Sequence, residues 1–393
     1  MLQSKIGRSK DELVEFCRQL IRTPSPSGSE EKIAKLITSK MQGLHYDSVE
    51  VDDFGNVIGI IEGSSRDRTV IFDGHMDTVD PGDRRNWRVD PYSARIIGNA
   101  IYGRGACDMK GALASMIFSG SIVKQTGKLR GRLVVACVVH EEPCEGFGIR
   151  KIMEKIGESD YVVLGEATNL NLALGHRGRA ELEIETYGRT AHGSMPDRGI
   201  NAIHMMLPVI ERIRKRASNL PAHSFLGRAT VSVNRISCSP DQSAVVPDRC
   251  KITVDRRTIP GETRERLVAE CKRYLKQAKA KGKIRISIMK LRCFTGKTEK
   301  VELYFPAWVL DRNEEIVRKA RTALESVLKR SPKLTKWHFS TDGNYTAGLR
   351  GIPTIGFGPG DERLAHTPNE HILIDDITAA TRGYCALAAS LCA

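Results

Sequence analysis

Helical and strand-like patterns alternate over the first 175 residues, and this alternation constrains the fold more than any other feature of the chain. Residues 10–21 and 30–41 repeat apolar side chains at helical spacing, and the uncharged apolar run at residues 111–123 predicts a buried helix. Strand-like runs lie among these segments, at residues 49–51, 57–61, 69–72, 133–139 and 161–164. Strands that alternate with helices predict an α/β layer with a mostly parallel sheet.

The middle of the chain has the pattern of a different fold. Four expected strands and two expected helices follow one another there, at residues 180–187, 201–216, 230–233, 251–254, 262–279 and 283–288. The order strand, helix, strand, strand, helix, strand predicts a small antiparallel α+β domain with ferredoxin-like topology. A helix at 313–329 and a strand at 353–357 then resume the first pattern. We therefore expect one domain of residues 1–177 and 296–393, interrupted by an inserted domain of residues 178–295.

Composition excludes several classes of protein. Of the 393 residues, 40% are hydrophobic and 27% are charged, the balance of a globular protein. The run at 111–123 is too short to cross a bilayer, and the N-terminal stretch MLQSKIGRSKDELVEF lacks the apolar block of a secretory signal. The ten cysteines include no Cys-x-x-Cys pair, which predicts reduced thiols in the core. We expect a cytoplasmic protein that binds no membrane.

The net charge of +14 raises the question of a nucleic-acid partner. Residues 264–285 hold nine basic and only two acidic residues, and apolar residues at helical spacing make the first part an amphipathic helix with a solvated basic face. Tyr274 is the only aromatic residue in this stretch, so it offers no stacking platform for bases. The sequence predicts no nucleic-acid partner.

Histidines and carboxylates gather near the ends of the expected buried strands. His75 and Asp77 follow TVIFDG, Glu166 follows YVVLG, His366 follows PTIGF in a loop rich in glycine and proline, and Asp108 precedes the buried helix. Residues two apart on a strand share a face, so we expect Asp77 to accept a hydrogen bond from the His75 ring and aim it at a metal. Taken singly, a structural His-Asp pair and a helix N-cap at Asp108 are the ordinary alternatives.

Glu141 and Glu142 end the strand LVVACVVH as two adjacent acids, an arrangement that is costly unless a cation lies between them. Adjacent side chains of a regular strand point to opposite faces, so both reach one site only if the chain bends, and Pro143 favours a bend there. Together, the histidines and carboxylates suffice for two tetrahedral zinc ions that share one carboxylate, with another left as a general base. This set of side chains predicts metal-assisted hydrolysis.

The segments that carry these residues resemble the motif series of a large di-zinc family, which includes aminoacylases, acetylornithine deacetylases, succinyl-diaminopimelate desuccinylases and glutamate carboxypeptidases. In chain order the segments are HMDTVD, GRGACDMKGALASM, HEEPCEGFG, GEATN, AHGSMPDRGINAI, VDRRTIPGET, STDGN and FGPGDERLAHTPNEHI. The resemblance runs from about Arg22 to Ile372. Within the family the chain is most similar to hydrolases linked to selenium metabolism, through RRNWRVDPYSA, LYFPAW and KWHFSTDGN.

The resemblance implies a ligand set for two Zn²⁺ ions per chain, with Co²⁺ as a substitute. One ion would be held by His75, Asp108 and Glu166. The other would be held by Asp108, Glu142 and His366, so that Asp108 bridges the two.

The resemblance also implies a catalytic role for Asp77, Glu141 and His192. Asp77 would be the hydrogen-bonded partner of the metal ligand His75. Glu141 would take a proton from the metal-bridging water and deliver it to the leaving amine. His192, in AHGSMP, matches a histidine that reaches into the partner chain's active site as an oxyanion donor. The inserted domain would accordingly be a lid, and it would also form the interface of a homodimer.

The substrate would be held by residues of the lid and of the His366 loop. Arg257 in DRRTIP matches a position that binds a substrate carboxylate, with Arg256 as the rival because the arginine is doubled. Gly358 is expected with the substrate-binding residues and, with Gly360, shapes the loop that carries His366. Where relatives have Asn-Val-Ile-Pro, this chain has Ala244 at the start of the stretch, so the contact made by that Asn is missing or supplied elsewhere.

These features predict a hydrolase that cleaves an amide bond in a small molecule with a free carboxylate. The expected substrates are N-acyl amino acids, as for a deacylase, or peptides, as for a carboxypeptidase or dipeptidase. The alternative is a non-catalytic member of the family that acts as a binding protein.

Overall fold

A computed structural model describes residues 2–393, which divide into two compact units. The larger unit ends its first segment at His176 and is completed by Leu291–Glu299 and Val309–Ala393. The inserted unit consists of Arg177–Lys290 and Lys300–Trp308. The first boundary lies one residue from the expected position. At the second, the chain enters the larger unit for nine residues and then returns to the inserted unit.

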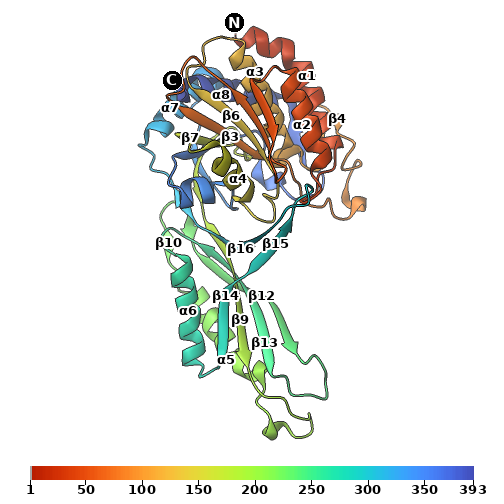
Figure 1. Cartoon of the computed structure of the whole chain (residues 1–393), viewed down its shortest axis with the longest axis vertical. Coiled ribbons are helices and arrows are strands. Elements are labelled where there is room, and N and C mark those ends of the chain that lie inside the picture. The colour runs from red at the N-terminus through yellow and green to blue at the C-terminus, as the bar shows by residue number, and fades with distance from the viewer. Residues whose placement is uncertain (1) are drawn as a thin grey trace. The chain divides into compact units, whose positions relative to one another are not determined.

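The larger unit is built on a nine-stranded sheet of order β1-β2-β6-β3-β7-β20-β8-β18, with β19 paired to β8. Its central strands β6, β3, β7 and β20 run parallel, whereas β2 is antiparallel to β6 and β8 is antiparallel to β20. The sheet is therefore mixed, with a parallel centre (Figure 1). Its strands are β1 (Ser48–Val51), β2 (Val57–Ile61), β3 (Thr69–His75), β6 (Arg132–Val138), β7 (Tyr161–Leu164), β8 (Leu172–His176), β18 (Trp308–Val309), β19 (Leu334–Trp337) and β20 (Thr354–Gly356).

The most deeply buried helix of this unit is α3, as its uncharged sequence predicts. Every residue from 111 to 123 is buried, and the helix packs against α1 and α8. Strands β3 and β6 are buried at every position after the first, as expected for parallel strands covered on both faces. The helices of the unit are α1 (Leu2–Arg22), α2 (Glu31–Gly43), α3 (Gly111–Lys124), α4 (Phe147–Ile156), α7 (Glu315–Leu328) and α8 (Ile374–Leu391).

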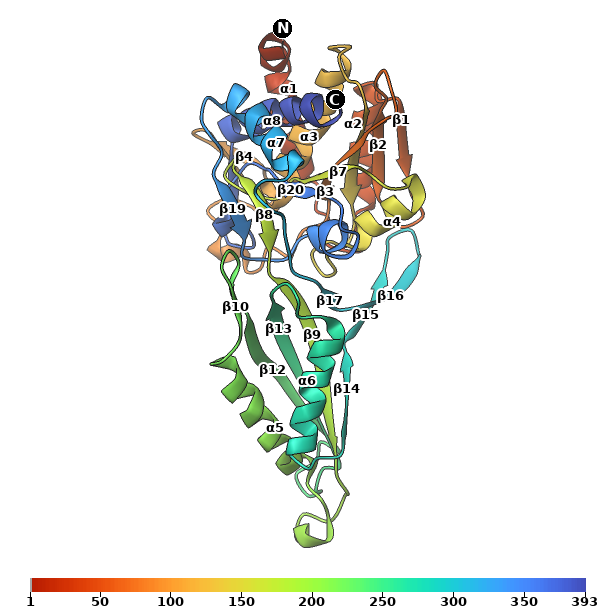
Figure 2. The same ribbon diagram turned by 90° about the vertical axis from the view of Figure 1, so that its left-hand side faces the viewer.

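The inserted unit has one antiparallel sheet of order β12-β13-β9-β14, against which α5 and α6 pack (Figure 2). Buried and half-buried positions alternate along β9, which directs Ala180, Leu182 and Ile184 into a core shared with both helices. The predicted ferredoxin-like order is confirmed by this element order. Its elements are β9 (Gly178–Tyr187), α5 (Ala202–Ala217), β12 (Thr230–Ser239), β13 (Arg249–Thr258), α6 (Arg264–Gln277) and β14 (Gly282–Ile286).

Short strands complete both units. A three-stranded sheet and two hairpins stand apart from the large sheets, and β17 pairs with β9. These strands are β4 (Arg95–Ile97), β5 (Ala100–Tyr102), β10 (Ala222–His223), β11 (Gly227–Arg228), β15 (Ile288–Arg292), β16 (Thr298–Glu302), β17 (Tyr304–Phe305) and β21 (His371–Leu373).

Almost all of the net charge belongs to the inserted unit. It holds 25 Lys and Arg against 12 Asp and Glu, a net charge of +13 out of +14 for the chain. Part of this charge lies on β14, which ends the sheet and exposes Lys283 and Arg285. Charged side chains on an edge strand oppose pairing with the edge of another molecule. A solvated basic edge therefore explains part of the basic run without a polyanionic partner.

Two expectations from composition can be compared with the structure. None of the described helices combines the length and the apolar character needed to cross a membrane. Nine of the ten cysteines are buried, so the prediction that most of them are core residues is confirmed, and none forms a disulfide in the described part of the chain.

Gly356 in β20 provides a test of the packing of the larger unit. A Cβ atom there would collide with the ring of Trp337, which is itself 2% exposed. We expect Gly356→Ala to lower the free energy of unfolding by about 2 kcal/mol, since overpacking a filled core forces neighbours out of their rotamers. The matched control is Gly43→Ala in α2, where a Cβ meets no atom within 4 Å, and denaturant unfolding should show a change of less than about 0.5 kcal/mol. Equal stability of the two variants would contradict this packing.

Candidate metal centre

The expected site residues follow parallel strands that end at one edge of the large sheet. His75 is the last residue of β3, Glu141 and Glu142 follow β6, and Glu166 follows β7. His366 lies in the loop after β20. Open α/β sheets bind their ligands at the carboxyl ends of such strands. The strand-end positions identified in the sequence are therefore brought together by the fold.

Asp108 connects two groups of side chains. Its Oδ1 lies 2.8 Å from His75 Nε2, and that nitrogen lies 3.6 Å from Glu166 Oε1. Its Oδ2 lies 3.2 Å from His366 Nε2, and that nitrogen lies 2.9 Å from Glu142 Oε2. Asp108 has a non-helical backbone and makes no cap to α3, which excludes the helix N-cap alternative. Each oxygen of Asp108 faces one histidine, and each of these histidines lies near one further carboxylate.

Two sets of ligand atoms are close enough to bind a metal ion. Atoms of His75, Glu141 and Glu166 lie within 4.8 Å of one another, and so do atoms of His75, Asp108 and Glu142. Imidazole nitrogens and carboxylate oxygens of this kind are common ligands of zinc and other divalent ions. Glu141 thus lies among the candidate ligands as well as in the position expected of a general base.

The carboxylates of the site repel one another. Burial raises the pKa of Glu141, Glu142 and Glu166 above the ordinary value, and the negative charges of neighbouring acids raise it further. Burial also acts to raise the pKa of Asp108, but hydrogen bonds from His366 and His75 hold it below its usual range. Divalent cations would relieve this repulsion, because they supply more positive charge than the two histidines alone. The residues present therefore fit a metal centre.

Glu141 and Glu142 reach the same site because the chain turns sharply at His140, which has a left-handed φ of 58°. The expected bend is therefore present, and its left-handed residue is His140. The turn is held by Asp77, whose Oδ1 accepts a hydrogen bond from the Glu141 N–H at 3.1 Å and whose Oδ2 accepts one from the Glu142 N–H at 3.2 Å. One carboxylate thus fixes both acids.

Asp77 orients His75 through its main-chain carbonyl. His75 Nδ1 donates to Asp77 O at 2.8 Å, whereas Asp77 Oδ1 is 3.7 Å away. The expected hydrogen bond from His75 to Asp77 is therefore confirmed, but the acceptor is the main-chain carbonyl and not the side chain that was expected to share a face with His75. A proton held on Nδ1 leaves Nε2 as the nitrogen that faces a metal. The carboxylate also accepts a hydrogen bond from Ser27 Oγ at 2.6 Å, a contact that the sequence did not predict.

Glu370 was also missed, although it holds the loop that carries Asp108. It is fully buried and accepts hydrogen bonds from Arg104 Nη1 at 2.6 Å, from the Cys107 N–H at 2.8 Å and from the Asp108 N–H at 3.0 Å. Burial raises the pKa of Glu370 to about 7. The only signal in the sequence is an acid four residues after His366 in AHTPNEH.

A second pair of buried acids, Asp73 in β3 and Asp342 in the STDGN segment, interacts electrostatically. Asp73 and Asp342 are 1% and 4% exposed, and Asp342 accepts a hydrogen bond from the Gly146 N–H. Burial raises the pKa of both carboxyl groups, to about 6 for Asp342, and the charge of Asp342 raises that of Asp73 further. The sequence offered no reason to pair them, because they lie far apart along the chain.

Comparison with known proteins places this geometry in a family. The model of peptidase family M20/M25/M40 matches residues 71–390, most of the chain. The chain belongs to this peptidase family. The uncharacterized protein YgeY of Escherichia coli strain K12 is 34% identical over 387 residues, which cover 97% of this chain and 96% of YgeY.

Solved structures of M20 relatives share the fold. Aminopeptidase PepT of Bacillus cereus superposes with a TM-score of 0.74 at 23% identity, and covers 97% of this chain and 98% of its own. The YXEP protein of Bacillus subtilis, described as a dinuclear metal-binding peptidase of family M20, superposes with a TM-score of 0.73 at 16% identity and covers 98% of each chain. These likenesses confirm the α/β fold with an inserted domain.

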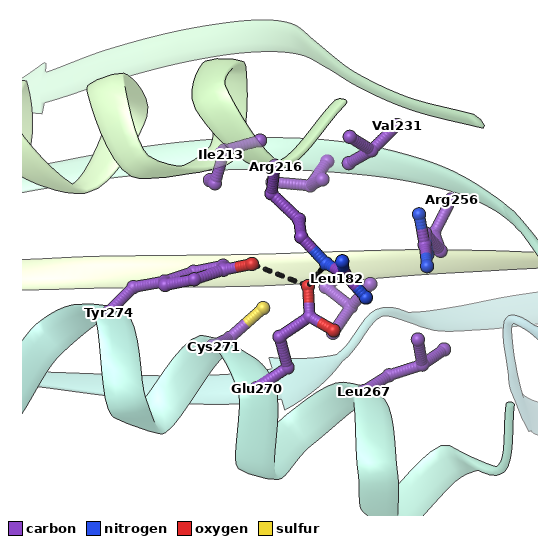
Figure 3. Close-up of a pocket in the computed structure, with 10 residues that line it drawn as sticks. Leu182, Ile213, Arg216, Val231, Arg256, Leu267, Glu270, Cys271 and Tyr274 are labelled. Atoms are coloured by element: carbon purple, nitrogen blue, oxygen red, sulfur yellow. Dashed lines mark hydrogen bonds and ion pairs between the residues drawn. The ribbon is translucent and has the colours of Figure 1, made fainter. Parts of the chain in front are cut away.

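In this M20 protein, the two candidate arginines of the inserted unit point to opposite faces of β13. Arg256 is 3% exposed, pairs with Glu262 and lines a cavity of about 20 Å³ between α5, α6 and the sheet (Figure 3). A cavity of that size holds about one water molecule and not a substrate. Arg257 lies on the other face, where its Nε is 2.9 Å from Asp255 Oδ1 and its side chain is 33% exposed. The geometry favours Arg257 over Arg256 as a substrate ligand.

His192 lies in an exposed loop of the inserted unit. His192 Nδ1 lies 2.7 Å from Ser194 Oγ and accepts a hydrogen bond from the Ser194 N–H at 3.2 Å, an arrangement that suits the tautomer with its proton on Nε2. The Gly193 N–H donates to Ala244 O at 2.7 Å, and Val245 forms a β-bridge with His192. The stretch that departs from the family pattern therefore supports the His192 loop.

Gly358 is buried beside a candidate metal ligand. A Cβ atom at this position would collide with the carbonyl oxygens of Gly165 and Glu166, so only glycine lets the two loops approach this closely. Gly360 has a φ of +84°, and a side chain there would meet Cys107. Both glycines shape the loop that leads to His366, and a role of Gly358 in substrate binding stays a prediction.

Removal of metal by a chelator should reveal the repulsion between the carboxylates. In the metal-free protein, Glu141, Glu142 and Glu166 have pKa values raised above 4.5, so stability is lost as the pH rises above that value. His366 acts in the same direction, since its pKa is raised to about 10 and its stabilising charge is lost as the pH approaches that value. Metal ligands must also be deprotonated to bind, so metal binding strengthens with pH.

We therefore expect Zn²⁺, at a fixed concentration a thousand times its Kd at pH 8, to stabilise the metal-free protein by about 4 kcal/mol at pH 8 and by less at pH 5.5, where Kd is larger. Thermal unfolding with and without a chelator measures this difference. A melting temperature that is the same with and without metal, or a gain that does not grow with pH, would contradict the assignment of these acids to a metal centre.

Proposed function

We propose that the protein is a di-metal hydrolase that cleaves an amide bond in a small molecule with a free carboxylate, such as an N-acyl amino acid or a short peptide. The observation that carries this proposal is the position of Asp108, each oxygen of which faces one histidine. Membership of the M20 peptidase family and the dinuclear metal site named for the YXEP protein support the reaction class. The ten free cysteines fit a reducing compartment such as the cytoplasm.

Two Zn²⁺ ions, for which Co²⁺ would substitute, are the proposed cofactors. His75, Asp108 and Glu166 would hold one ion, and Asp108, Glu142 and His366 the other. When bound, such ions polarise a carbonyl group and lower the pKa of a water molecule. Asp77 fixes the ring of His75, and Glu370 fixes the loop of Asp108, so the ligands are already oriented in the folded chain.

Glu141 is the proposed general base and acid. It is 6% exposed, and its burial raises its pKa, which makes it a stronger base than a solvated glutamate. Its carboxylate would accept a proton from the attacking water and return it to the leaving amine. The hydrogen bond from its N–H to Asp77 Oδ1 keeps the side chain at the site. A free base is what separates an enzyme from a metal-binding module.

The inserted unit would supply substrate recognition. Arg257 would hold the substrate carboxylate, for which a guanidinium group offers two parallel hydrogen bonds. His192 would donate from Nε2 to the oxyanion in the active site of a second copy, in a homodimer formed through the inserted unit. The N–H of Ser194 bonded to Nδ1 supports this proposal, because it suits the tautomer with its proton on the nitrogen that would donate.

A non-catalytic binding protein is the second candidate. The complete set of ligands would also suit a protein that binds metal and substrate without turnover. Glu141 favours the enzyme, since binding requires no buried base in addition to the ligands of two ions.

Substitution of each of the two adjacent acids by glutamine separates the role of Glu141 from that of Glu142. Glu141→Gln should lower kcat by about 10²- to 10⁴-fold, the usual contribution of a general acid-base, and keep two ions per chain. Glu142→Gln is the matched control and should lose bound metal. Release of amine from a panel of N-acetyl and N-succinyl amino acids and dipeptides measures activity, and elemental analysis measures metal. Loss of metal in Glu141→Gln would make Glu141 a ligand, and full activity in that variant would refute the proposed function.

A further inference from the structure

The tip of the β15–β16 hairpin belongs to the larger unit, whereas β15 begins and β16 ends in the inserted unit. The hairpin tip is defined here as Leu291–Glu299. Leu291 and Cys293 are only 3% and 2% exposed. Thr295 Oγ1 donates to Asp53 O at 2.8 Å. Because of this excursion the chain passes between the units four times instead of the two that a simple insertion requires.

An aromatic side chain and an acid fasten the hairpin tip. The ring of Phe294 lies against Gly55, where φ is +101° and a Cβ atom would collide with that ring. Glu299 binds α4 through two cations, since its oxygens lie 2.7 Å from Arg150 Nη2 and 2.8 Å from Lys151 Nζ. Helix α4 follows directly on the loop that carries Glu141, so the hairpin tip is tied to the chain just beyond the proposed base.

The main chain of the hairpin tip also reaches the residue just before Glu141. His140 Nε2 lies 3.2 Å from Arg292 O, and because a carbonyl only accepts, Nε2 carries the proton. The other ring nitrogen, Nδ1, is buried and has no hydrogen-bond partner among the described residues. A Cβ on Gly28 would lie 3.0 Å from the same carbonyl oxygen, so the loop that carries Ser27 also passes close to the hairpin tip.

The backbone at His140 is left-handed and is held in part by the bonds of the next two N–H groups to Asp77 and by a bond from the Cys144 N–H to the His140 carbonyl at 3.2 Å. Its own N–H has one long contact, 3.4 Å to Glu30 Oε1. A non-glycine residue with positive φ is strained and persists only where its surroundings fix it. The bond to Arg292 and the edge-to-face contact with Phe147, at 6.0 Å between centroids, fix the ring of His140 and add to that support.

We propose that the hairpin tip is a positioning element for Glu141, acting through His140 and α4. The inference rests on the proposed function, since it takes Glu141 as the base. Arg292, Phe294 and Glu299 are positioning residues, because they touch neither substrate nor metal ligands. The sequence did not suggest this role, because the segment RCFTGKTEK lies at the expected domain boundary and has no motif of its own.

The double variant Phe294→Ala, Glu299→Gln loosens the hairpin tip and leaves every candidate ligand in place. We expect kcat to fall about tenfold, since displacements below 1 Å of a catalytic group are costly, while KM changes less than twofold and two ions remain bound. Hydrogen exchange of residues 139–147, followed by mass spectrometry, should become at least about fivefold faster, because the turn opens more often. The matched control is Glu325→Gln, which breaks the exposed pair with Arg321 on α7 and should change neither quantity.

A second variant replaces residues 293–297 by Asn-Gly, a two-residue turn, and should have the larger effect on both measurements. If it fails to fold, the double variant alone decides the matter. Unchanged exchange at 139–147 together with unchanged kcat would overturn the inference. The same changes to the hairpin tip should also be made in a Glu141→Asp variant, where an effect that acts through Glu141 should be smaller. A fall in kcat as large in that variant as in the wild type would also overturn the inference. Failure of the proposed function shows separately, as full activity of Glu141→Gln.

Discussion

Four carboxylates with little exposure to solvent repel one another at the candidate metal centre of the larger unit. Asp108, Glu141, Glu142 and Glu166 meet at one edge of the sheet, and only two histidines balance their charge. Burial of these acids is unfavourable unless cations lie beside them. Metal ions bound at this one site would therefore stabilise the folded chain. Asp108 is the centre of this arrangement, because each of its two oxygens faces a different histidine.

The rest of the larger unit holds these groups in place. Parallel strands bring His75, Glu141, Glu142 and Glu166 to one edge, and the loop after β20 adds His366. The Asp77 carboxylate accepts hydrogen bonds from the N–H groups of Glu141 and Glu142, and the Asp77 main-chain carbonyl orients the His75 ring. The main-chain contacts matter as much as the side chains, because they fix where the acids point. The hairpin tip extends the same principle to the far side of the His140 turn.

Much of this site was predictable from the sequence, because a buried strand that ends in His, Asp or Glu places that residue at a known edge. The helix and strand patterns also predicted the ferredoxin-like order of the inserted unit. Contacts that depend on backbone conformation were not predictable. The expected bend has its left-handed residue at His140, and Asp77 accepts the bond from His75 through its main-chain carbonyl, because no periodic pattern encodes a left-handed residue or the choice between two acceptor oxygens.

Long-range partners were missed for a related reason. Glu370 holds the loop of Asp108 across 262 positions of the sequence, and the hairpin tip lies where the expected domain boundary falls. The most direct test of the account is the metal content of the wild-type protein and of Asp108→Ala, measured by elemental analysis after reconstitution with Zn²⁺. The shared carboxylate predicts two ions per chain in the wild type and none held firmly in the variant. One firmly bound ion in Asp108→Ala, or none in the wild type, would contradict it.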